Sequence, residues 1–112
     1  MEVTVKSEEG ITVIEAAGNI DSKTAPEFQN SAVSAAEGKD KIIIDLTKVE
    51  FLSSAGLRVL LMIYRQIKAN NGQVVLVGTS EDIQDVMANT GFLNFFILAE
   101  NLEEGIQAFK EV

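Results

Sequence analysis

The sequence contains no cysteine and no histidine. Without cysteine the chain forms no disulfide and has no thiol nucleophile, and without histidine it lacks the imidazole base of a Ser-His-Asp triad. The two residue types that supply most zinc ligands are therefore both missing. These absences exclude the common zinc sites and most nucleophilic catalysis, so we expect a protein that is not an enzyme, with no catalytic residue, no metal and no cofactor.

Positive charge is also scarce, because nine Lys and Arg stand against 17 Asp and Glu, giving a net charge of -8. Such a surface repels a phosphate backbone, so we expect no nucleic-acid partner. No apolar run reaches the ~20 residues of a membrane-spanning helix, and residues 1–5 lack the basic and apolar regions of a signal peptide. We therefore expect a soluble, cytoplasmic protein with no direct membrane insertion.

The apolar content of the chain is sufficient for one core. Of the 112 residues, 46% are hydrophobic. A chain of this size buries roughly two-thirds of the surface that its unfolded form exposes, which is enough to fold without disulfides or a metal. No repeat or low-complexity segment divides the sequence, so we expect a single domain over residues 1–112.

The pattern of apolar residues and turn signals predicts alternating elements after an initial hairpin. The predicted elements are strands at 2–6 and 11–15, a helix from 24 to about 37, a strand at 41–46, a helix at 57–68, a strand at 73–78, a helix from 80 to about 91, a strand at 94–98 and a last helix from 101. The run at 41–46 is continuously apolar and β-branched up to Asp45, which is typical of a central strand covered on both faces.

Other local signals set the helix starts and the fold class. Thr24 and Glu27 have the spacing of a capping box, with Pro26 in the first turn of the helix. We expect the helix at 57–68 to be the most buried helix, and Met62 and Met87 to fill space in or next to the core. Alternating helices and strands imply right-handed crossovers between parallel strands. The predicted fold class is α/β, with a mixed sheet that begins with an antiparallel hairpin and has about four helices.

The segment most informative about function is residues 45–60, Asp-Leu-Thr-Lys-Val-Glu-Phe-Leu-Ser-Ser-Ala-Gly-Leu-Arg-Val-Leu. It places Ser53 and Ser54 at the start of a buried helix. Free backbone N–H groups and the helix dipole there favour an anionic group by about 0.3–1 kcal/mol, so a phosphate on a serine would be tolerated. Serine is also a favoured helix cap, and the residue types alone leave open whether either serine does more than cap the helix.

This segment resembles the signature of the STAS domain family, which sulfate transporters and anti-sigma factor antagonists share. In that signature, Asp-Leu-Ser is followed after a few residues by Asp-Ser-Ser/Thr-Gly-Leu-Gly. Alignment on Gly56 and Leu57 puts the phosphorylated serine of the family at Ser54, with Ser53 as a minor candidate. A second match is the segment 18–21, Gly-Asn-Ile-Asp, which is similar to the family's Gly-x-Leu/Ile-Asp before its first helix.

The order of elements agrees with the family along the whole chain, but two positions depart from its sequence pattern. Ser53 stands where many phosphorylated members have an acidic residue, and Arg58 stands where they have glycine. The resemblance implies an α/β STAS domain.

The resemblance also implies a partner-binding surface built from both motifs. Its predicted residues, besides Ser54, are Asn19, Asp21, Thr24, Ser53, Ala55 and Gly56. Asp21 matches a family position at the rim of that surface, but an aspartate before a helix is often a solvated terminal charge, and both interpretations stay open. We give Asp45 and Thr47 a supporting role, in which the Asp45 carboxylate hydrogen-bonds to backbone N–H groups of the loop rather than acting as a base.

The family resemblance implies a binding module rather than a catalyst. As an anti-sigma factor antagonist, the unphosphorylated chain would bind an anti-sigma factor that is also a serine kinase, and so free a sigma factor. Phosphorylation of Ser54 would end the binding, and a serine phosphatase would restore it. The alternative is a STAS scaffold subunit that docks on a transporter ATPase of the phospholipid-trafficking type. A serine hydrolase would need a base, and Lys48 is the only lysine near the motif in sequence.

Overall fold

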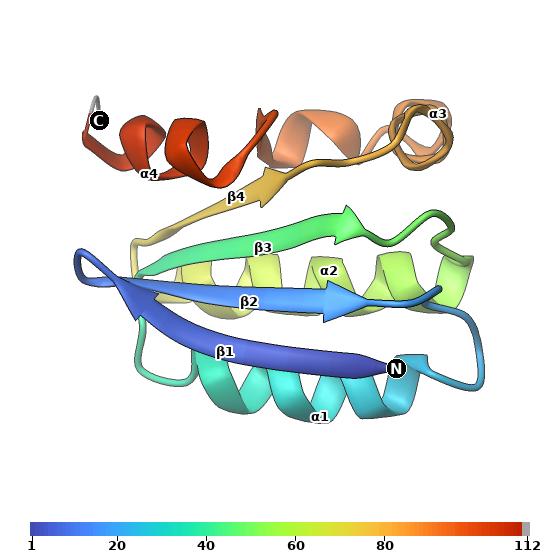
Figure 1. Cartoon of the computed structure of the whole chain (residues 1–112), viewed down its shortest axis with the longest axis horizontal. Coiled ribbons are helices and arrows are strands. Elements are labelled where there is room, and N and C mark those ends of the chain that lie inside the picture. Colours follow the sequence, from blue (N-terminus) through green and yellow to red (C-terminus); the bar gives the residue numbers. More distant parts are fainter. Residues whose placement is uncertain (111–112) are drawn as a thin grey trace.

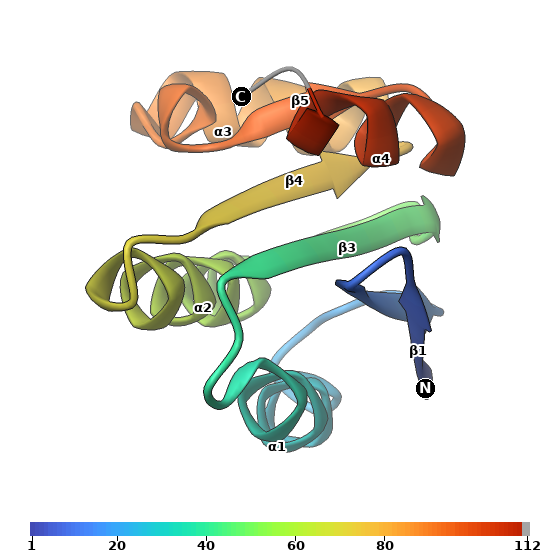
Figure 2. The same cartoon turned by 90° about the vertical axis from the view of Figure 1, so that its left-hand side faces the viewer.

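A five-stranded sheet in the order β1-β2-β3-β4-β5 forms the centre of the molecule in the computed structural model, which describes residues 1–110 (Figures 1 and 2). The strands are β1 (Glu2–Glu8), β2 (Ile11–Ala17), β3 (Lys41–Lys48), β4 (Gln73–Val77) and β5 (Ile97–Ala99). The helices are α1 (Ala25–Ala36), α2 (Ser54–Ala69), α3 (Glu81–Thr90), the 3₁₀ helix η1 (Leu93–Phe95) and α4 (Leu102–Lys110). β1 pairs antiparallel with β2, and the other neighbours are parallel. This confirms the predicted α/β class and mixed sheet.

The hairpin between β1 and β2 is closed by a two-residue turn. Glu8 pairs with Ile11, and the turn residues Glu9 and Gly10 have φ angles of 52° and 81°. Positive φ at both positions is the signature of a type I′ turn, whose twist matches that of the flanking strands. The turn sets the register that places Val3 opposite Ala16 and Val5 opposite Ile14.

Two apolar cores lie on the two faces of the sheet. On one face, α1, α2 and α3 pack against the side chains of Ile42 and Ile44. On the other face, α4 packs over Ile43, Val75 and Val77. The β-branched run of β3 is buried because each face of the strand meets a helix layer, and β3 is the middle strand as predicted.

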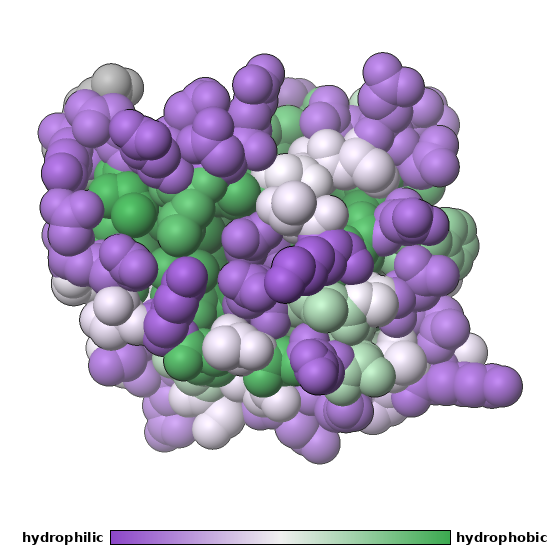
Figure 3. Space-filling model, in the orientation of Figure 1, coloured by the Kyte–Doolittle hydropathy of each residue, from purple (hydrophilic) through white to green (hydrophobic). Residues whose placement is uncertain are grey.

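The outer surface is largely hydrophilic in the view of Figure 3, with an apolar area on the side where α4 lies. None of the helices described here has the length and apolar content that crossing a bilayer requires.

Two predicted elements differ most from the structure. The helix predicted at 57–68 begins at Ser54, because Ser53 adopts an extended conformation and caps it. The strand predicted at 94–98 is divided into η1 and β5. The N–H of Phe95 donates to the carbonyl of Phe92 (3.1 Å), and the ring of Phe95 stacks on Tyr64 with centroids 5.2 Å apart. These contacts favour a 3₁₀ turn over an extended chain.

Two side chains also differ from the expectations. Met87 is fully buried as predicted, but Met62 is 37% exposed, because Leu60, Ile63 and Ile67 define the buried face of α2. Thr24 precedes α1 in a helical conformation, and its hydroxyl makes no cap hydrogen bond to the helix. The predicted capping box at Thr24 is therefore wrong.

Candidate functional site

Two loops that are distant in sequence meet at one end of the sheet, one after β2 (residues 18–24) and one after β3 (residues 49–53). The N–H of Ile20 donates to the carbonyl of Phe51 (3.1 Å), and the N–H of Ser53 donates to the carbonyl of Ile20 (2.8 Å). These bonds form a parallel bridge between Ile20 and Leu52. Because β2 and β3 are parallel neighbours, their following loops leave the sheet at the same end, and the two family-like segments lie side by side (Figure 1).

Gly56 allows the start of α2 to approach this bridge closely. A Cβ atom at position 56 would lie 2.6 Å from Leu52 Cδ1 and 2.7 Å from Ile20 Cγ2. Both distances are too short for carbon atoms, so a larger residue would push the helix away from the bridge. Gly56 itself is buried. Gly56 therefore does not contact a partner directly; it lets α2 pack closely beneath the two loops that form the predicted surface.

The carboxylate of Asp21 organises the loop before α1. Its Oδ1 accepts hydrogen bonds from the N–H groups of Lys23 (2.9 Å) and Thr24 (3.0 Å). These bonds, led by that of Thr24, hold the pKa of Asp21 below its ordinary value, because they stabilise the charged form. The Thr24 hydroxyl in turn accepts from the N–H of Asp21 (3.0 Å) and donates to the carbonyl of Asn19 (2.8 Å). Asp21 and Thr24 thus stiffen the loop.

Asn19 links the two loops through its side chain. Its Oδ1 accepts a hydrogen bond from the N–H of Phe51 (3.2 Å). Asn19 is exposed, so its side chain is accessible to a partner while it also holds the second loop. With the Ile20 bridge, this bond holds the Asn19–Thr24 loop against the segment that leads into α2.

The two adjacent serines at the start of α2 have different environments. Ser53 is the N-cap residue, and its Oγ accepts a hydrogen bond from the N–H of Gly56 (3.3 Å). Ser54 is the first residue of the helix and is exposed. Among the residues that the structure describes, the Ser54 hydroxyl has no hydrogen-bond partner. The capping role predicted for one of the serines belongs to Ser53, which leaves the hydroxyl of Ser54 accessible to another protein.

The surface around Ser54 offers apolar contacts that the sequence interpretation missed. Phe51 is 50% exposed beside the two serines. A groove of about 190 Å³ runs between the beginnings of α1 and α2, and it is lined by Ser22, Ala25, Pro26, Gln29, Ala55, Arg58 and Val59. The signal for Phe51 was its place next to Leu52, since successive residues of an extended segment point to opposite sides. The groove has no comparable signal, because it depends on how two helices pack.

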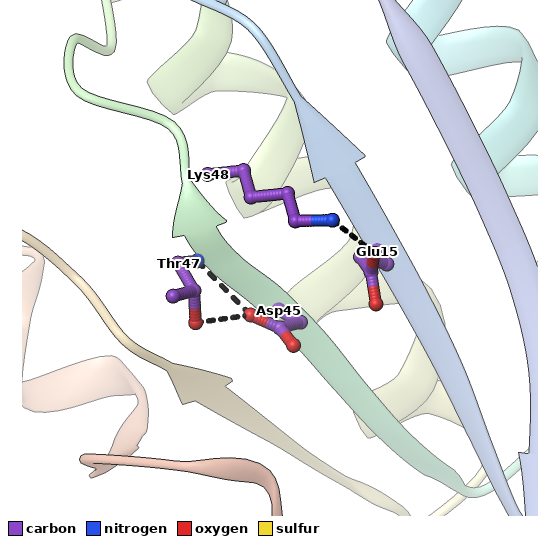
Figure 4. A network of polar contacts seen from close by, with 4 residues as sticks. All are labelled: Glu15, Asp45, Thr47 and Lys48. Carbon is purple, nitrogen blue, oxygen red and sulfur yellow. Dashed lines mark hydrogen bonds and ion pairs between the residues drawn. The ribbon is translucent and has the colours of Figure 1, made fainter.

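Asp45 and Thr47 form a separate polar cluster (Figure 4). The Asp45 carboxylate accepts from the N–H (2.9 Å) and the hydroxyl (2.6 Å) of Thr47, and Lys48 Nζ lies 3.5 Å from Glu15 Oε1. Along β3, Asp45 and Thr47 share the face of Ile43, which α4 covers. The structure thus does not bring Asp45 and Thr47 next to Ser54, and their contacts define the end of β3 from which the second loop leaves.

A second, larger recess of about 700 Å³ opens beside Thr47. It is lined by Thr47, Gly78, Thr79, Gln84, Leu98, Ala99, Glu100 and Glu104. The lining has two carboxylates and no basic residue, so it does not favour an anionic cofactor. Within residues 1–110, no group of three or more acidic residues is arranged to hold a metal ion.

Comparisons with known proteins agree with this architecture. The family model of the STAS domain matches residues 2–105. BtrV of Bordetella bronchiseptica, which is named as an anti-sigma factor antagonist, is 29% identical over 98% of this chain and 96% of its own length. The crystal structure of an anti-sigma factor antagonist from Mycobacterium paratuberculosis is 27% identical, with a TM-score of 0.87 over 97% of this chain and 93% of its own.

The same fold occurs in SpoIIAA of Bacillus, whose structure is known in a phosphorylated form. That structure is 20% identical to this chain and has a TM-score of 0.74, covering 96% of this chain and 99% of its own. The likeness at this identity concerns the fold. Since the family model spans 2–105 and the structure brings its two characteristic segments together at one end of the sheet, the chain belongs to the STAS domain family.

Proposed function

We propose that this protein is an anti-sigma factor antagonist whose binding to an anti-sigma factor is switched by phosphorylation of Ser54. The observation that carries the proposal is the contrast between the two serines: Ser53 Oγ is used to cap α2, whereas the hydroxyl of Ser54 is exposed on the surface formed by the two joined loops. The names of BtrV and of the mycobacterial protein, and the phosphorylated form of SpoIIAA, support the proposal.

In the unphosphorylated state, the partner packs on the surface around Ser54. Phe51 supplies a half-exposed aromatic side chain of the kind that often dominates binding energy at interfaces. The hydrogen bonds of Asp21 and Asn19 hold the Asn19–Thr24 loop in place before binding, which reduces the entropy lost on association. The groove beside Ala55 receives a side chain of the partner.

Phosphorylation changes this surface without disturbing the core. A kinase transfers the γ-phosphoryl group of ATP to Ser54 Oγ, releasing ADP and the hydroxyl proton, and the product carries about -1.5 to -2 charges at pH 7. The start of α2 tolerates this anion, so the domain stays folded. A partner packed there would have to bury an imperfectly paired dianion, which costs several kcal/mol and lowers affinity by orders of magnitude.

The chain acts in this cycle as substrate and ligand, not as an enzyme. The anti-sigma factor, acting as a serine kinase, supplies the ATP site. A serine phosphatase supplies the hydrolysis, in which water cleaves the phosphate ester, releases inorganic phosphate and regenerates the Ser54 hydroxyl.

The direct test is incubation with the cognate kinase and ATP, followed by mass spectrometry of the segment 51–58. We expect one phosphate, on Ser54, with Ser54→Ala unmodified but still bound to the anti-sigma factor. Ser53→Ala is the matched control and remains a substrate. Phosphate on Ser53 instead would move the site by one residue. No phosphate on either serine would overturn the proposal and favour the scaffold subunit of a transporter ATPase.

A second measurement tests the extent of the binding surface. Asp21→Arg reverses the charge of the loop beside Ser54, so we expect weaker binding of the anti-sigma factor by calorimetry. Asp40→Arg, the same charge reversal at an exposed position before β3 and so at the other end of the sheet, serves for comparison. Unchanged affinity in a folded Asp21→Arg protein would remove the Asn19–Thr24 loop from the interface.

A further inference from the structure

The strand β1 forms one edge of the sheet, far from the chain's other edge strand, β5. All of its residues from Glu2 to Glu8 pair with β2, and no strand of the described chain lies on its outer side (Figures 1 and 2). β1 contains no proline and its pairing with β2 has no bulge. A long, regular edge of this kind is a template for another strand.

The type I′ turn determines which backbone groups face outward. In such a turn the carbonyl of Glu8 accepts from the N–H of Ile11, so these two residues form a hydrogen-bonded pair. Hydrogen-bonded and non-hydrogen-bonded pairs alternate along an antiparallel ladder. The N–H and C=O groups of Glu2, Thr4 and Lys6 therefore point to β2, and those of Val3, Val5 and Ser7 point to the open edge.

The side-chain surface beside this edge is uncharged and partly apolar. Val5 is 48% exposed on the side of the sheet that α1 covers. Between it and α1 lies an open groove of about 450 Å³, lined by Val5, Asn30, Ser31, Ser34 and Ala35. In a chain with a net charge of -8, this groove carries no charged residue.

We propose that a second copy of this chain pairs with β1, antiparallel and across a two-fold axis at Thr4. The outward groups of Val3, Val5 and Ser7 can bond only in registers centred on one residue. Axes at Thr4, Val5 and Lys6 pair at least five residues of Glu2–Glu8 in each copy, whereas axes at Val3 and Ser7 pair only three. An axis at Val5 sets Glu2 opposite Glu8, and an axis at Lys6 sets Lys6 opposite itself. The axis at Thr4 sets Glu2 opposite Lys6 twice, so charge complementarity selects this register.

The register at Thr4 also covers the exposed valine. Val3 of each copy lies opposite Val5 of the other in a hydrogen-bonded pair. Glu2 and Lys6 fall in non-hydrogen-bonded pairs, in which side chains approach most closely. The α1 helices of both copies lie on the same side of the joined sheet, and their uncharged flanks face each other.

Dimerisation in this way leaves the candidate functional site of each copy accessible. The loops around Ser54 follow the carboxyl ends of β2 and β3, and the two-fold axis places these ends at opposite ends of the joined sheet. A dimer therefore presents two surfaces for the proposed partner. The inference about β1 does not rest on the phosphorylation switch, and each can fail without the other.

The test is sedimentation equilibrium of the full chain over a concentration series up to about 1 mM, which covers weak dimers. We expect a monomer–dimer equilibrium. Glu2→Lys and Lys6→Glu each place like charges opposite one another, and we expect each to weaken the dimer about tenfold or more. An equimolar mixture of the two variants restores opposite charges and should dimerise, as should the double variant that carries both changes.

Glu8→Lys is the matched control, since it changes the net charge as Glu2→Lys does but lies beyond the paired stretch. It should not weaken the dimer. Hydrogen exchange gives an independent readout: amide protection should rise with concentration at Val3 and Val5, and not at Thr4 and Lys6, which already bond to β2. A chain that stays monomeric, equal effects of Glu2→Lys and Glu8→Lys, or no rescue in the mixture would each overturn the proposal.

Discussion

A single exposed aromatic residue, Phe51, combines anchoring to the scaffold with accessibility. Its N–H is held by Asn19 Oδ1 and its carbonyl by the N–H of Ile20, so the backbone is fixed while half of the residue's surface stays open. Because the backbone is already ordered, only the rotations of the aromatic side chain have to be restricted on binding. We therefore assign Phe51 to the proposed partner surface.

Truncation of this side chain should weaken partner binding. For Phe51→Ala we expect a loss of about 2 kcal/mol in binding free energy, the size of an interface hot spot, with little change in stability. Calorimetric titration with the anti-sigma factor measures the loss. Phe95→Ala, which truncates another phenylalanine of similar exposure on η1, should leave the affinity unchanged. Equal losses for the two variants would argue against a specific role for Phe51.

The Asp21 carboxylate should make the stability of the protein depend on pH. The N–H groups of Thr24 and Lys23 lower its pKa in the folded state below the ordinary value of 3.8. The unfolded state therefore binds more protons in the interval between the two pKa values. The stabilisation is complete above the unfolded pKa and is lost as pH falls through the lower folded pKa.

Replacement of Asp21 by asparagine tests this linkage. We expect the difference in unfolding free energy between the wild type and Asp21→Asn to be largest above about pH 5 and to shrink below about pH 4. Denaturant titrations at several pH values measure the difference, and a carboxyl NMR titration gives the pKa of Asp21 itself. A pKa at or above the ordinary value would contradict the observed hydrogen bonds.

At the scale of elements, the start of α2 depends on its cap. Ser53 Oγ satisfies the N–H of Gly56, one of the groups without a partner inside the helix. We expect Ser53→Ala to lower the unfolding free energy by about 1 kcal/mol, and Ser54→Ala to leave it nearly unchanged. Urea denaturation of the two variants gives the comparison. A larger loss for Ser54→Ala would mean that the two serines have exchanged roles.

The packing of α2 against the Ile20–Leu52 bridge depends on the close approach at Gly56. A methyl group at position 56 would overlap Leu52 and Ile20, which are both buried. We expect Gly56→Ala to destabilise the domain by about 1–3 kcal/mol through overpacking. Ala55→Ser, which adds one heavy atom at the neighbouring half-buried position, should cost less when both are measured by thermal unfolding. Equal losses of stability for the two variants would show that Leu52 and Ile20 can move aside at little cost.

At the scale of the whole molecule, charge determines which partners are compatible. A net charge of -8 produces a field that repels polyanions at long range. We expect no submicromolar binding to duplex DNA at physiological salt, measured by fluorescence anisotropy. Tight binding whose affinity falls steeply with salt concentration would reveal a basic patch and contradict this expectation.

The sequence predicted most of the fold because the determining signals are local. The β-branched run of β3 identified the central strand, and the closely spaced strand patterns at 2–6 and 11–15 identified the hairpin. The predictions failed at Thr24 and at the 94–98 segment, where contacts with other segments compete with local preference. Thr24 bonds within the Asn19–Thr24 loop rather than capping α1, and Phe95 stacks on Tyr64 of α2.

By itself, the sequence determined the α/β class, the acidic surface, the absence of thiol and imidazole chemistry, and the two family-like segments, since these follow from composition and from neighbours along the chain. Only the tertiary structure decided that Ser53 is the cap while Ser54 is open, that Phe51 is exposed, and that Asp45 and Thr47 lie on the opposite face of the sheet from α2. The reason is geometric: these properties depend on side-chain direction and on distances between elements, which a hydrophobic pattern does not specify.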